Sequence, residues 1–100
     1  MDVKVTTILK LYTLLFLREG DKHGYELMKR LEPKVGKVST SQIYPFLSQL
    51  MKAKLVEVAS NGGRDKKVYR LTKEGEKFVD KLCSGFWEMH HVFKKTQGKA

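Results

Sequence analysis

The chain has 100 residues, the length of a single domain whose core is modest and would gain from a second copy. Twenty Lys and Arg against 11 Asp and Glu give a net charge of +9, which favours a polyanionic partner, nucleic acid or an anionic membrane, although a merely soluble basic protein is an alternative. The longest apolar stretch, Ile8 to Leu17, is too short to span a bilayer, and the single Cys83 cannot form an intrachain disulfide, so we expect a cytoplasmic protein without a membrane span.

Two helices are predicted first. Apolar residues at 8, 11, 12 and 15, with 5, 9 and 16 beside them, predict a largely buried helix from Val3 to Arg18. A second helix is predicted near 24–31, with Asp21 or His23 as its N-cap. We expect Pro33 and Gly36 to end it.

The third predicted helix starts at Ser39, which has Gln42 three residues later in the spacing of a capping box. Its apolar residues fall on one side. The other side carries short hydroxyls, an amide and a phenol, which can donate to phosphates and to base edges. From residue 33 to residue 56 there are four Lys and no acid. The DNA-binding residues expected on this helix are Thr40, Ser41, Tyr44, Pro45, Ser48, Gln49 and Lys52.

A hairpin follows, because 55–60 and 67–71 alternate with period two around the turn sequence NGGRD. Arg64, Lys66 and Lys67 lie at its tip and are also expected to bind DNA. Three helices followed by a basic hairpin predict a mainly α winged helix-turn-helix domain over residues 1–72. In this fold the third helix enters the major groove and the hairpin lies against the backbone or the minor groove.

A last helix is predicted from its cap Thr72 to about Thr96. Its apolar row has the 3-4-3-4 spacing of a helix that packs on another helix, so residues 73–100 are expected to be a dimerisation helix with a frayed tail. The row consists of Val79, Leu82, Phe86, Met89 and Phe93.

Cys83, His90 and His91 lie on this last helix, and their side chains are of the kinds that can bind a metal ion. Residues 83 and 90 are two helical turns, roughly 10 Å, apart. A metal site would therefore need ligands from both subunits, so no metal or cofactor is expected; a thiol redox switch at Cys83 is a further alternative.

Three motifs, HGYELMKRL, IYPFLSQLMKAKLVE and GGRDKKVYRLTKEGEKF, occur in order between Ile8 and Phe78. In this combination the chain resembles the PadR family of winged-helix transcriptional regulators. The resemblance implies a homodimeric repressor whose two third helices bind an inverted repeat. The residues that match the motifs are Tyr25, Tyr44, Pro45, Tyr69, Arg70 and Thr72.

The same resemblance implies that Tyr44 contacts a phosphate, whereas Tyr25, Tyr69 and Thr72 serve packing and capping. The family often has Arg or Lys where this chain has Ser48 and Gln49. This departure shifts the expected affinity from base contacts to phosphate contacts and the wing.

Only a short segment follows the wing, so the resemblance is to the short members of the family, which dimerise through one C-terminal helix. In some of them aromatic residues line a cavity between subunits that accepts flat aromatic or cationic compounds. Phe86 and Trp87 are the corresponding candidate effector site, and the alternative is that both fill the dimer core.

Motifs of catalysis are absent from the sequence: it has no Gly-rich phosphate loop, no H-E-x-x-H and no nucleophile elbow. We therefore expect a regulator that is not an enzyme and whose partner is double-stranded DNA. The competing predictions are a winged helix that serves as a protein-interaction module, a non-specific architectural DNA-binding protein and, less favoured, an RNA-binding protein.

Overall fold

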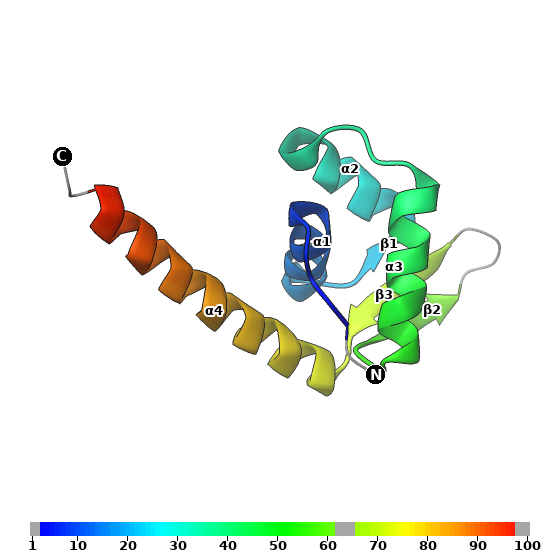
Figure 1. Ribbon diagram of the computed structural model, residues 1–100. Coiled ribbons are helices and arrows are strands. Elements are labelled where there is room, and N and C mark those ends of the chain that lie inside the picture. Colours follow the sequence, from blue (N-terminus) through cyan, green and yellow to red (C-terminus); the bar gives the residue numbers. More distant parts are fainter. Residues whose placement is uncertain (1–2, 62–65, 98–100) are drawn as a thin grey trace.

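The computed structural model describes residues 3–61 and 66–97. The first three of the four helices and a small sheet gather in one body, and Figure 1 shows the long last helix running outward from it. The molecule has extents of 56 × 29 × 21 Å. The predicted fold class, mainly helical with a small β-wing, is confirmed. The elements are α1 (Ile8–Glu19), β1 (Lys22–His23), α2 (Gly24–Val35), α3 (Thr40–Lys52), β2 (Val56–Asn61), β3 (Lys67–Leu71) and α4 (Lys73–Gln97).

Helix α1 begins later than predicted. The hydroxyl of Thr7 accepts a hydrogen bond from the Lys10 amide at 3.2 Å, which caps the helix one residue before Ile8, so the predicted start at Val3 is wrong. The expected burial is also wrong in part. The face with Leu14 and Leu17 enters the core, whereas Ile8 is 64% exposed. Helix α1 carries apolar residues on two faces. The periodicity of the apolar residues does not indicate which of these faces packs against the core of the same chain.

Helix α2 has His23 as its N-cap, one of the two predicted residues. The backbone N–H of His23 donates to Glu26 Oε1 at 3.1 Å, and the ring Nδ1 lies 2.7 Å from the same oxygen. These contacts lower the pKa of Glu26. Pro33 does not end the helix, which continues to its C-cap at Gly36 (φ 89°), because a proline one turn from the end removes only a single backbone donor.

The sheet has the strand order β1-β3-β2 and is antiparallel throughout. The predicted hairpin is its β2 and β3, with an irregularity in register between Val58 and Ser60. Strand β1 was not predicted, since two residues are too few to show an alternation. It pairs Lys22 with Tyr69, and this pairing holds the start of α2 against the wing.

Thr72 caps α4 as predicted and also fixes this helix to the end of α3. Its hydroxyl accepts from the Gly75 amide at 3.0 Å and donates to the Lys54 carbonyl at 2.7 Å, while its own amide donates to the Leu55 carbonyl at 3.0 Å. Val79 has no exposed surface within the chain. Its assignment to a dimer surface is therefore wrong, because the first turns of α4 complete the core of their own domain.

Candidate nucleic-acid interface

Helix α3 has a buried apolar side and an exposed polar side, as the sequence predicts. Ile43, Phe46, Leu47 and Leu50 are buried in the core. The Ser39 amide donates to Gln42 Oε1 at 3.0 Å, which fixes the start of the helix. The opposite side faces solvent: Thr40, Ser41, Tyr44, Pro45 and Lys52 are exposed, and Ser48 and Gln49 are half-exposed.

The wing adds positive charge beside this face. Lys66 and Lys67 are exposed at the start of β3. Arg64, the third basic residue expected here, lies outside the described residues. In Figure 1 the hairpin stands next to α3, at the end of the molecule away from the tip of α4. An anion along α3 would therefore meet the wing lysines as well.

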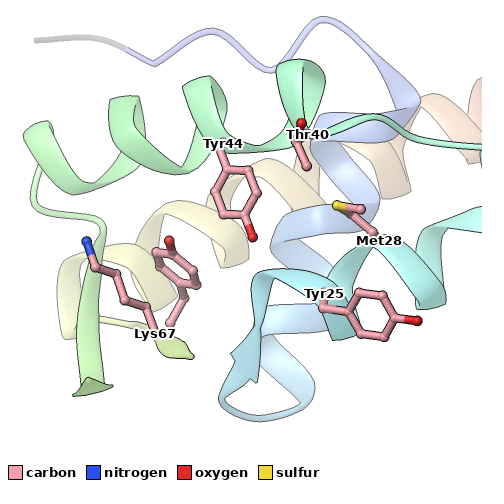
Figure 2. Close-up of a pocket in the computed structure, with 6 residues that line it drawn as sticks. Tyr25, Met28, Thr40, Tyr44 and Lys67 are labelled. Carbon is pink, nitrogen blue, oxygen red and sulfur yellow. The ribbon is translucent and has the colours of Figure 1, made fainter. Parts of the chain in front are cut away.

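A hollow of about 480 Å³ lies where α2, α3 and β3 meet. Figure 2 shows Tyr44 pointing from α3 into this hollow, Lys67 on its wing side, and Tyr25 at its α2 side. Its polar groups are hydroxyls and one ammonium, all of which can donate hydrogen bonds, and none of its lining residues is acidic. The lining residues are Tyr25, Met28, Thr40, Tyr44, Lys67 and Tyr69.

Tyr69 lies at the buried base of this hollow, with 4% of its surface exposed. Burial raises the pKa of its hydroxyl, and the neighbouring Tyr44 raises it further. A tyrosine with the ordinary pKa of 10.0 is already protonated at neutral pH, and both effects make its ionisation less favourable still. The hollow therefore presents neutral donors and one positive charge, a combination suited to a phosphate oxygen.

The sequence analysis did not assign two residues of this hollow, Tyr25 and Met28, to DNA binding. Tyr25 was expected to pack, but it is 62% exposed, with Lys29 above its ring at 5.5 Å. Met28 also lines the hollow and is not among the site residues that the sequence predicts. The motif that contains Tyr25 was visible in the sequence. Its proximity to α3 depends on how α2 crosses the domain, which no local pattern encodes.

Helix α4 carries a second exposed surface, this one apolar. A groove of about 620 Å³ is lined by Phe78, Lys81, Leu82, Gly85, Phe86 and Met89. Beyond it Trp87 is 62% exposed, and its ring stacks on His90 (centroids 5.7 Å apart) and meets His91 edge-on at 4.9 Å. Phe93, the last residue of the predicted apolar row, is 55% exposed.

Within residues 3–61 and 66–97, no group of three metal-ligating side chains comes together. Cys83 is half-buried and carries a free thiol. In the same part of the chain, no helix has both the length and the apolar character needed to cross a bilayer.

The helix-turn-helix formed by α2 and α3, with a β-hairpin wing beside it, defines the class of winged-helix DNA-binding proteins. The model of the transcriptional regulator PadR-like family matches residues 13–81. The chain belongs to this family, and it is a DNA-binding transcriptional regulator rather than an enzyme.

Solved structures agree with this assignment. RosR of H. salinarum is 26% identical, with a TM-score of 0.77 over 88% of this chain and 80% of that one. A PadR-like transcriptional regulator of Bacillus cereus is 27% identical, with a TM-score of 0.74 over 93% of each chain. A PadR family regulator of Clostridium difficile shares the fold at 22% identity, with a TM-score of 0.76 over 91% and 99%. A search of curated proteins finds no match.

Proposed function

We propose that the protein is a homodimeric, sequence-specific repressor whose two α3 helices bind the half-sites of an inverted repeat. The observation that carries this proposal is the acid-free, solvent-facing side of α3 beside the donor-lined hollow and Lys67. Such a surface complements the DNA backbone, which supplies much of the affinity of DNA-binding proteins. We infer from this function that the protein acts in the compartment that holds the DNA, in agreement with the cytoplasmic location expected from the sequence.

The apolar side of α4 supports the dimer. Phe86, Met89 and Phe93 leave apolar surface in solvent on a helix that projects from the body, and contiguous patches of this kind mark interaction sites. Phe86 also shares a small hollow of about 120 Å³ with Ile8 and Leu11 of α1. A second copy packed along α4 would cover this surface and the exposed end of α1 together.

An effector site at Phe86 and Trp87 is the finer part of the proposal. The exposed indole of Trp87 offers a face to a flat aromatic or cationic compound. Bound between two α4 helices, such a compound would change the distance between the two α3 helices and so their fit to the operator. Titration of Trp87 fluorescence with a panel of planar cations tests this. Because Trp87 is the chain's single tryptophan, free tryptophan titrated with the same compounds is the control for inner-filter effects.

The DNA proposal is tested by selecting bound duplexes from a random pool and then titrating the selected sequence and a scrambled one at two salt concentrations. We expect an inverted repeat that binds more tightly than the scramble. Equal, salt-sensitive binding to both would instead establish a non-specific architectural protein. Failure to bind any duplex at low salt would favour the protein-interaction module.

The dimer is tested by Phe93→Lys in analytical ultracentrifugation, with Lys95→Ala as the control. Phe93 is a better choice than Leu82, because Leu82 packs against the core of its own chain and its replacement would disturb the fold as well. A charge buried at an interface is costly, so we expect the Phe93→Lys variant to sediment as a monomer. A variant that remains dimeric would show that α4 does not form the interface.

A further inference from the structure

Gly24, the first residue of α2, lies directly against the ring of Tyr44 on α3. A β-carbon placed on Gly24 would be 2.5 Å from the Tyr44 hydroxyl oxygen and 2.9 Å from two carbons of its ring. Contacts below 3.0 Å do not occur at real β-carbons, so one of the two residues would have to move. The Tyr44 ring therefore occupies the space that a side chain at residue 24 would need.

Conformational freedom does not explain a glycine at this position. Among the described glycines only Gly36 has a φ in the left-handed range, so Gly24, inside α2, has backbone angles that alanine adopts. Alanine is also the better helix former. What glycine provides at residue 24 is room for Tyr44, and this room lies at the edge of the hollow that also contains Lys67 and Tyr69.

We propose that Gly24 is a positioning residue for DNA binding: it touches no DNA, and it holds the Tyr44 hydroxyl in the hollow where a backbone phosphate binds. This rests on the proposed function. Figure 2 shows the geometry that the proposal needs, with Tyr44 reaching from α3 across the hollow instead of outward along the helix. Without this placement the hydroxyl leaves the hollow that it shares with Lys67 and Tyr69.

Of the two residues, Tyr44 is the one that would move. Gly24 is buried and follows β1, whose pairing of Lys22 with Tyr69 and His23 with Val68 fixes the backbone. The contact between His23 and Glu26 fixes it again one residue before Gly24. Tyr44 is 37% exposed and can rotate about its side-chain bonds into solvent. A methyl group at residue 24 should therefore displace the tyrosine and leave the fold intact.

The test is a double-mutant cycle with Gly24→Ala, Tyr44→Ala and the double variant, each titrated against the duplex selected for the wild type. Gly20→Ala is the matched control, because a β-carbon there has no atom within 4 Å. We expect Gly24→Ala to weaken binding of the proposed dimer about a hundredfold, which corresponds to about tenfold for the loss of one hydrogen bond to a charged group in each of the two subunits. In the Tyr44→Ala background the same change should have no effect.

Two further readouts separate this role from a general defect. Tyrosine is neutral and releases no counterion, so Gly24→Ala should lower the affinity and leave the slope of log K against log salt unchanged. An NMR cross-peak between the Gly24 α-protons and the Tyr44 ring protons should be present in the wild type. In the Gly24→Ala variant the cross-peak between the α-proton of residue 24 and the Tyr44 ring should be absent.

The proposal and the function on which it rests fail in different ways. A wild type that binds no duplex overturns both. A wild type that binds while Gly24→Ala binds equally well overturns the role of Gly24 alone. The same follows if Gly24→Ala weakens binding as much in the Tyr44→Ala background as in the wild type, or if the cross-peak is absent from the wild type.

Discussion

Gly75→Ala should destabilise the protein strongly, because Gly75 lies where α4 crosses the corner between α3 and β2. A β-carbon there would be 2.0 Å from the backbone oxygen of Leu55. Since such contacts do not fall below 3.0 Å, the helix and the corner must part by about 1 Å. The same oxygen accepts the Thr72 amide at 3.0 Å, so this movement also strains the hydrogen bond that starts α4.

Overpacking a rigid site costs typically 1–3 kcal/mol and a weakened buried hydrogen bond adds to it, so we expect a loss of about 2–4 kcal/mol in the free energy of unfolding. For a domain of this size the midpoint of thermal unfolding should fall on the order of 10–20 °C. Circular dichroism at one fixed protein concentration measures it. Lys77→Ala is the control in the same helix, since Lys77 is exposed and lies outside the apolar groove of α4. A Gly75→Ala variant as stable as the wild type would refute the reasoning.

Three further predictions concern charged and titrating groups. Lys67→Ala should reduce the slope of log K against log salt by about 1.8, because it removes one phosphate contact in each of the two subunits of the proposed dimer, while Lys95→Ala, at the far end of α4, should leave it unchanged. Lys22→Met should cost about 1–3 kcal/mol in urea unfolding, because the buried ammonium donates to the Phe16 carbonyl at 2.8 Å; the exposed Lys77→Met is the control. Burial raises the pKa of Tyr69 above its ordinary 10.0, so its contribution to stability is present below pH 10 and is lost at higher pH. Tyr69→Phe should therefore lose less stability than the wild type between pH 8 and pH 11, and equal losses would contradict the shift.

The sequence predicted those parts of the fold that depend on local patterns. The period of the apolar residues located α3, and the capping residues Ser39 and Thr72 located the starts of α3 and α4. Errors arose where tertiary contacts decide the outcome. Val79 has the spacing of the apolar row but packs inside its own domain, and β1 exists only because β3 lies beside it.

The same distinction between local patterns and tertiary contacts applies to the candidate site. The residues on the solvent side of α3 follow from helical projection, which is a property of one element. The hollow does not, because it is formed by three elements and depends on the close approach of Gly24 and Tyr44. A glycine that makes room for a residue 20 positions later in the sequence leaves no periodic signal.

The limited base-reading chemistry of α3 is a reason why sequence-specific binding would require the proposed dimer. Ser48 and Gln49 are only half-exposed, which limits their reach to base edges. A single domain would then bind mainly through phosphates, and phosphate contacts do not distinguish sequences. Joining two domains makes the second binding event intramolecular, which multiplies modest preferences at each half-site only if the spacing between half-sites fits the dimer. On this reasoning, specificity depends on the direction in which α4 leaves the domain. Thr72 and Gly75 fix that direction against the end of α3. Small distortions of this contact between α4 and the end of α3 should therefore lower the ratio of the affinities for operator and scrambled DNA more than they lower the affinity for scrambled DNA.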